Sequence, residues 1–175
     1  MEGKLIFDWK GVAFMSLIPL GLFALAVAAL DQLSKFLVLQ WIPHRQVVEC
    51  VPGLFHLTYV KNYGAAFSML QGQQWLFFLV FVAFVGLLVW GLKKKSLPFK
   101  PFELWCLAAV LGGGLGNIID RAVRGFVVDM IEVEFITFPV FNVADCFITC
   151  GAIALLVHLA FWNREFWRDE KKSEK

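Results

Sequence analysis

The sequence predicts a mainly α-helical, polytopic membrane protein with four transmembrane helices and a small extracytoplasmic β-sheet. Hydrophobic residues make up 59% of the 175 residues and charged residues only 17%. The mean hydropathy of +0.71 is too high for an ordinary soluble domain. A membrane-spanning helix needs roughly 20 apolar residues, and four segments meet this length: Val12–Leu30, Gln74–Leu92, Phe102–Ile119 and Phe141–Trp162. We expect residues 1–175 to form a single membrane domain.

The distribution of Lys and Arg predicts that both termini are cytoplasmic. Of the 16 such residues, 11 lie in the N-terminal tail, the second connection and the C-terminal tail. The first and third connections are therefore expected outside. No basic patch interleaved with aromatic residues points to nucleic acid. Lys4 and Lys10 before the first apolar run resemble a signal peptide, but the run has full span length and continues in helical sequence, so we expect no cleavage.

The first span ends in a charged pair, because Asp31 precedes Lys35 by four residues. This is the favourable order for an ion pair within a helix. The pair either serves a site or only neutralises the end of the helix.

The first connection, about residues 37–73, is rich in β-forming residues. The segments Gln46–Val51 and Leu54–Lys61 flank a Pro-Gly turn and predict a small sheet. Asn62 and Gly64 then break the second strand. Asn62 either positions a ligand by hydrogen bonds or belongs to a simple turn.

The third span ends in polar residues, which are costly in a membrane and therefore functional candidates. At helical spacing they form two rows with nearby glycines: Gly112, Gly116 and Asp120 in one, and Gly113, Asn117 and Arg121 in the other. Glycines let another helix approach closely, so we expect the polar end to face protein rather than lipid. Arg124 follows Asp120 by four residues and could pair with it.

Beyond Gly125 the sequence alternates as a strand does. One side would carry Asp129, Ile131, Val133 and Phe135, and the other side Met130, Glu132 and Glu134. The two glutamates would face water, whereas Asp129 shares the apolar side. Asp129 is therefore a carboxylate in an unexpected place.

The fourth span brings a second carboxylate to the same membrane surface. Asn142 and Asp145 resemble a capping box, which accounts for Asp145 alone but not for Asp129. Two carboxylates in a low-dielectric site share a proton. One can then act as a general base on water while the other polarises a carbonyl group, which is aspartic peptide hydrolysis. A small proton-linked transporter that uses intramembrane carboxylates is an equally natural interpretation at this point.

Other chemistries lack their motifs. No serine-hydrolase, zinc-protease or phosphate-binding motif occurs. Cys50, Cys106, Cys146 and Cys150 have no accompanying His or second pair, and we interpret them as small packing residues. His56 is expected to be a surface strand residue, because no partner for metal binding or proton transfer lies near it in the sequence. We therefore expect neither a metal nor a cofactor.

Five segments together resemble one family. They are Asp31-Gln32-x-x-Lys35, Asn62-x-Gly64-Ala65-Ala66-Phe67, Gly113-x-x-x-Asn117-x-Ile119-Asp120-Arg121, Val127-Val128-Asp129 and Phe141-Asn142-x-Ala144-Asp145. This pattern resembles the lipoprotein signal peptidases, the bacterial signal peptidase II family of integral-membrane aspartic proteases. The resemblance covers about residues 30–151. Cys146 and Met130 depart from it, since a serine and an aromatic residue are more usual at these positions.

The resemblance implies a function and a set of site residues. The family removes signal peptides from prolipoproteins in the bacterial cytoplasmic membrane, cleaving before a cysteine that carries diacylglycerol. The implied site lies near the extracytoplasmic face, with Asp129 and Asp145 as the catalytic pair. Positions that line or support it match Asp31, Lys35, Asn62, Gly64, Asn117, Asp120, Arg121 and Asn142. The implied partners are lipid-modified prolipoproteins and membrane lipid.

Overall fold

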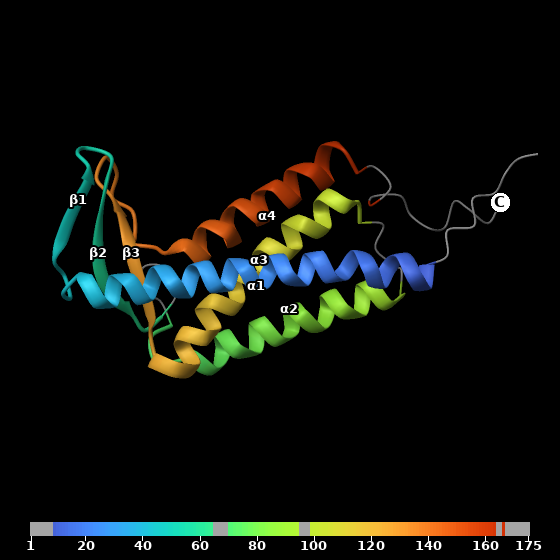
Figure 1. The fold of residues 1–175 in the computed structure, drawn as a ribbon, viewed down its shortest axis with the longest axis horizontal. Helices are drawn as coiled ribbons and strands as arrows, with labels where there is room; N and C mark the ends of the chain where they lie inside the picture. Colours follow the sequence, from blue (N-terminus) through green and yellow to red (C-terminus); the bar gives the residue numbers. More distant parts are fainter. Residues whose placement is uncertain (1–8, 65–69, 95–98, 164–165, 167–175) are drawn as a thin grey trace, which may run out of the picture.

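The computed structural model describes residues 9–64, 70–94, 99–163 and 166. Within these residues, four helices form a bundle and three strands form a sheet at one end of it (Figure 1). The elements are α1 (Trp9–Trp41), β1 (Val47–Val51), β2 (Phe55–Asn62), α2 (Gln74–Lys94), α3 (Pro101–Arg124), β3 (Val127–Val133) and α4 (Val143–Phe161). Each helix contains a segment long and apolar enough to cross a membrane. The predicted fold class is therefore confirmed.

Helix α1 extends well beyond Leu30, where the predicted membrane span ends, and includes the helical sequence expected after it. Its 33 residues correspond to about 50 Å at the rise of an α-helix, which exceeds the roughly 30 Å of a hydrocarbon core. The charged pair Asp31 and Lys35 does not end the helix, which continues to Trp41. Both side chains are fully buried in the protein. The last turns of α1 therefore reach the sheet (Figure 1).

Helices α3 and α4 differ by a few residues from the predicted spans 102–119 and 141–162, and the predicted N-cap Asn142 is confirmed. Helix α3 continues past Ile119 and ends where Gly125 adopts a left-handed φ of +76°. Helix α4 begins after Phe141, because the backbone of Phe141 pairs instead with that of Ile131 as an isolated bridge.

The sheet draws on both the first and the third connection rather than on the first alone. Its strands are antiparallel in the order β1-β2-β3. The predicted turn joins β1 to β2, with Gly53 at a φ of +75°. Strand β3 comes from the third connection, and its Asp129 lies opposite Val60 of β2. The sheet thereby carries Asp129 next to the polar end of the helices.

Both faces of the first half of β3 are covered, so Met130 is buried although it shares a side with Glu132, which was predicted to face water. The Met130 side chain is only 3% exposed and packs with Val128, Tyr59 and the end of α1. The long α1 supplies Val38 and Ile42 to this cluster. Alternation indicated which side chains share a face, but it did not indicate that α1 would cover the second face.

His56 is a strand residue of β2, as predicted, and it has partners that are distant in the sequence. Its Nε2 lies 2.8 Å from Glu132 Oε2, and its Nδ1 lies 3.1 Å from Glu134 Oε1. Hydrogen bonds to Glu132 and to Glu134 raise the pKa of the imidazole, because both stabilise its charged form. The two glutamates follow His56 by 76 and 78 residues, a separation at which sequence gives no pairing signal.

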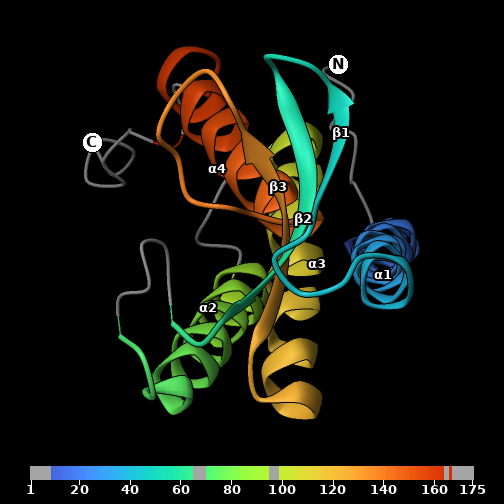
Figure 2. The same ribbon diagram turned by 90° about the vertical axis from the view of Figure 1, so that its left-hand side faces the viewer.

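Helix α3 lies at the centre of the bundle and packs against α1, α2 and α4 (Figure 2). Its glycines permit this close packing. A Cβ added at Gly112 would lie 2.5 Å from the Ala24 carbonyl oxygen of α1, and one at Gly113 would lie 2.5 Å from the Ala144 carbonyl oxygen of α4. The predicted role of this glycine row in close helix approach is confirmed.

We expect Gly113→Ala to lower the melting temperature in detergent, because its methyl group would collide with backbone of α4. Overpacking of this kind costs about 1–3 kcal/mol. Gly21→Ala in α1 is the matched control, because a Cβ there meets no atom within 4 Å. Equal melting temperatures for Gly113→Ala and the unaltered protein would contradict the packing described above.

Candidate active site

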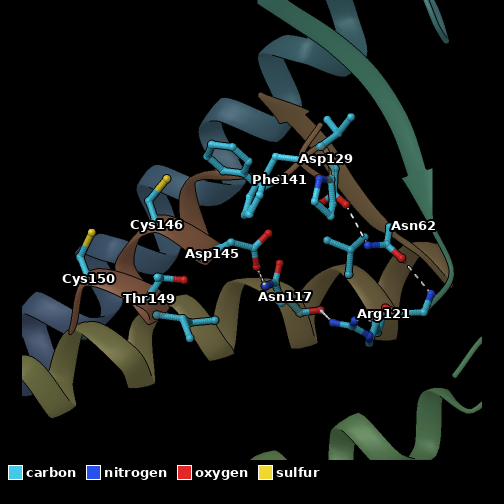
Figure 3. Close-up of a pocket in the computed structure, with 15 residues that line it drawn as sticks. Asn62, Asn117, Arg121, Asp129, Phe141, Asp145, Cys146, Thr149 and Cys150 are labelled. Atoms are coloured by element: carbon cyan, nitrogen blue, oxygen red, sulfur yellow. Dashed lines mark hydrogen bonds between the residues drawn. The ribbon is translucent and has the colours of Figure 1, made fainter. Parts of the chain in front are cut away.

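A pocket of about 470 Å³ opens where α3, α4 and the sheet meet (Figure 3). Its wall consists of polar side chains on α3 and the strands, the segment that leads into α4, and the first turns of α4. The lining residues are Asn62, Gly64, Asn117, Arg121, Val127, Asp129, Phe138, Pro139, Val140, Phe141, Asp145, Cys146, Ile148, Thr149 and Cys150. Asp129 and Asp145, which lie 16 positions apart in the sequence, therefore share one pocket.

Asp129 is the more buried of the two carboxylates, with 2% exposure. Its Oδ1 accepts a hydrogen bond from Asn142 Nδ2 at 2.7 Å, and its Oδ2 accepts one from Asn62 Nδ2 at 2.9 Å. Burial raises the pKa of Asp129 to about 7, and the nearby charge of Asp145 acts in the same direction. The two amide hydrogen bonds act in the opposite direction. Asp129 is therefore balanced between its protonated and ionised forms near neutral pH.

Asp145 is held at the start of α4 by the predicted capping box. The Asn142 side chain accepts a hydrogen bond from the Asp145 backbone N–H, and Asp145 Oδ2 accepts one from the Asn142 backbone N–H at 3.2 Å. Its other oxygen, Oδ1, accepts a hydrogen bond from Asn117 Nδ2 at 2.8 Å. Capping and exposure to the pocket are compatible, because one carboxylate has two oxygen atoms.

The amides of the site are oriented by their other partners. Asn62 Oδ1 accepts the Gly64 N–H, so its Nδ2 must face Asp129. Asn117 Oδ1 accepts from Lys35 Nζ at 3.0 Å, so its Nδ2 faces Asp145. Each donor is thus fixed toward a carboxylate by a bond on the far side of the same amide.

Arg121 forms a further part of the pocket wall. Its guanidinium donates to the Gly64 carbonyl at 2.9 Å and to the Asn117 carbonyl at 3.3 Å. The same group lies 4.0 Å from the ring centroid of Phe77 on α2, a cation–π arrangement. Arg121 therefore joins α2, α3 and the end of β2.

Asp31, Lys35 and Asp120 lie behind the pocket rather than in its wall. Lys35 Nζ is 2.8 Å from Asp31 Oδ2 and 3.0 Å from Asp120 Oδ2, with all three side chains fully buried. The predicted pairing of Asp120 with Arg124 is present. Gln32 joins this network by donating to Asp120 Oδ1 at 3.0 Å. Gln32 was part of a recognised motif but was not among the predicted site residues.

Some lining residues were not predicted. The segment 138–141 forms pocket wall. Phe141 belonged to a family motif, whereas residues 138–140 had no sequence signal beyond their position between a strand and a span. Cys146 and Cys150 also line the pocket. The interpretation of the cysteines as packing residues holds for buried Cys106 but is wrong for the exposed Cys50 and Cys150. Residues 65–67 of the second motif lie outside the described residues.

Metal binding has no support in the part of the chain that the structure describes. There, no group of three or more His, Cys, Asp or Glu side chains is arranged to hold a metal ion.

Comparison with known proteins decides the family. The sequence model described as Signal peptidase (SPase) II matches residues 23–161. The chain belongs to the signal peptidase II family. A lipoprotein signal peptidase of Streptococcus agalactiae serotype V is 43% identical over 151 residues, which is 86% of this chain and 96% of that protein. One of Streptococcus pyogenes serotype M1 is 41% identical over 139 residues, covering 79% and 90%.

Two solved structures, both described as bacterial membrane enzymes, resemble this signal peptidase II. One, determined at 2.3 Å, has a TM-score of 0.75 and 29% identity and covers 88% of this chain and 91% of its own. The other, determined at 1.9 Å, has a TM-score of 0.72 and 30% identity, with coverage of 81% and 92%. The four apolar helices and the family together indicate a multi-pass bacterial membrane protease.

Proposed function

We propose that this signal peptidase II removes the signal peptide from diacylglyceryl-modified prolipoproteins, cleaving before the lipidated cysteine, and that Asp129 and Asp145 activate the attacking water. The observation that carries the proposal is the shared pocket of the two carboxylates, each held by amide donors. The family match supports the substrate class. It does not favour the alternative of a proton-linked transporter.

The geometry suits a mechanism in which the two acids have different roles. Asp129 is the protonated member, because burial raises its pKa. Asp145 removes a proton from water as the oxygen attacks the scissile carbonyl carbon, and the Asp129 O–H protonates the carbonyl oxygen. The tetrahedral diol then collapses: Asp145 gives its proton to the leaving nitrogen, and Asp129 recovers its proton from a hydroxyl of the diol. The C–N bond breaks, and both acids return to their initial states.

The surroundings suit a substrate that is partly embedded in lipid. Polar groups lie at the α3 and sheet side of the pocket, whereas Phe138, Val140 and Ile148 add apolar wall. We propose that the acyl chains stay in the hydrocarbon against apolar helix faces while the peptide reaches the acids. In this arrangement the termini are cytoplasmic, the pocket lies near the extracytoplasmic face, and the whole chain acts as one membrane domain.

A gel-shift assay with two precursors tests this proposal. Purified protein is incubated with a diacylglyceryl-modified prolipoprotein and, in parallel, with the same precursor without lipid. We expect cleavage of the lipidated precursor alone. Cleavage of neither precursor, together with proton-coupled flux in proteoliposomes, would contradict the proposal.

A chelator arm of the same assay tests the predicted absence of a metal. We expect full cleavage in excess EDTA, because the proposed mechanism uses only carboxylates and water. Loss of cleavage that zinc restores would contradict the two-aspartate mechanism.

The pH dependence of cleavage tests the proposed proton on Asp129. We expect kcat/KM to fall as the pH rises through about 7, because Asp129 then loses the proton that it must donate. Asn62→Leu removes a hydrogen bond that lowers this pKa, so it should move the alkaline limb to higher pH. An alkaline limb that is unchanged in Asn62→Leu would show that it belongs to another group.

A further inference from the structure

Three buried charged side chains, Asp31, Lys35 and Asp120, do not line the pocket, yet the two carboxylates among them contact the backbone beside both of its acids. All three are 0% exposed. They come from α1 and α3, whereas the two acids are on β3 and α4. Burying three charges is expensive, and apolar packing would stabilise a fold equally well or better. Their contacts indicate what these charges contribute instead.

Each buried carboxylate holds the residue that precedes one of the two pocket acids. Asp31 Oδ1 accepts the backbone N–H of Ala144 at 2.9 Å, and Ala144 precedes Asp145. Asp120 Oδ2 accepts the backbone N–H of Val128 at 2.9 Å, and Val128 precedes Asp129. The two hydrogen bonds therefore fix the backbone of α4 and of β3 at the residue immediately before each pocket acid.

Lys35 connects these two fixed points. Its ammonium has three donors, and it has three partners within 3.0 Å: Asp31 Oδ2, Asp120 Oδ2 and Asn117 Oδ1. The third partner, Asn117, donates in turn to Asp145. The ammonium group thus links Asp31 and Asp120, the two carboxylates that hold the backbone beside the acids. It also orients the Asn117 amide that donates to Asp145.

The packing around this connection leaves little freedom. A Cβ at position 116 would lie 2.4 Å from Asp31 Oδ2, so only glycine leaves room for this carboxylate beside α3. Lys35 is held against α3 by two contacts of 3.0 Å. The distance between the two supports is therefore set by the ammonium rather than by flexible side chains.

We propose that Lys35 is a positioning residue that sets the separation of the two catalytic carboxylates, through Asp31 to Asp145 and through Asp120 to Asp129. The inference rests on the proposed roles of Asp129 and Asp145. Proton sharing requires the two carboxylates to be close together. Loss of the connection should therefore lower kcat and change the pH dependence of cleavage, with little effect on KM.

The test uses two variants, Lys35→Met and a triple variant, because Lys35→Met leaves two buried carboxylates without their shared partner and thereby destabilises the fold. In the triple variant Asp31→Asn/Lys35→Met/Asp120→Asn, the asparagine oxygens can still accept the two backbone N–H groups, and the charges are removed together. We expect kcat of either folded variant on the lipidated precursor to fall about 100-fold, the typical effect of a misplacement near 1 Å. KM should be nearly unchanged, and the limbs of the pH profile should move.

Glu103→Gln is the matched control for a loss of stability alone. Glu103 is a fully buried carboxylate on the other end of α3, where it accepts hydrogen bonds from the Lys100 backbone and from His158. This variant should lower the melting temperature but leave kcat and the pH profile unchanged.

The possible results separate the two proposals. A triple variant with unaltered kcat and pH profile would overturn the role of Lys35, and so would failure of both variants to fold, because the charges would then serve stability alone. If Asp129→Asn cleaves normally, the proposed function itself fails, whatever Lys35 does.

Discussion

Asp129→Asn is expected to abolish cleavage of the lipidated precursor, with a fall in rate of about 10⁴-fold or more. An amide cannot share or donate the proton that the mechanism requires from this position. The fold should survive, because Asp129 makes its two side-chain hydrogen bonds with the amides of Asn62 and Asn142, and loss of one such bond costs about 1 kcal/mol. Product formation and melting temperature should be measured on the same preparation.

The same measurement on Asp145→Asn provides a second arm. Asn can retain an acceptor at the start of α4, so this variant should also fold and be inactive. Near-normal cleavage by either variant would contradict the assignment of the two catalytic acids.

Asp120→Asn is expected to have the opposite effect, a large loss of stability with cleavage still measurable. Asp120 is fully buried between Lys35 and Arg124. Removing one partner of such a pair leaves a buried charge less well compensated, and we expect a cost of about 3 kcal/mol. Cleavage should persist at a reduced rate, because the asparagine oxygen can still accept the Val128 N–H.

Thermal unfolding and product formation in nanodiscs distinguish the two aspartates. An Asp120→Asn variant that is inactive but fully stable, beside an active Asp129→Asn variant, would reverse their assigned roles. Arg124→Gln is a useful companion, because it removes the partner of Asp120 at the more exposed end of the pair.

The sequence predicted the helices, the hairpin and the glycine packing because these depend on local patterns. Apolar runs gave the spans, and Pro52-Gly53 gave the turn between β1 and β2. The capping box of Asn142 and Asp145 was also predicted, since its partners are three residues apart.

What the sequence did not predict depends on contacts between distant segments. The covered face of Met130 requires α1 to extend to the sheet, and hydropathy ended that span at Leu30. The partners of His56 lie on β3 and beyond it. Asp31 could have been either a charge that neutralises a helix end or a buried support of α4, and spacing alone did not distinguish these two roles. The second role depends on Ala144, which is 113 residues away.

The pairing of β2 with β3 has a consequence for biogenesis. Helices α2 and α3 lie between these two strands in the sequence. The edge of β2 that pairs with β3 therefore stays unpaired until both helices have been synthesised and inserted. Long-range strand pairing of this kind is slow, because closing a large loop costs entropy before any contact forms. Asp129 joins Asn62 only at that step, and Asp145 follows later still in the chain. A ribosome-bound fragment that ends before α4 therefore lacks one of the two proposed catalytic carboxylates.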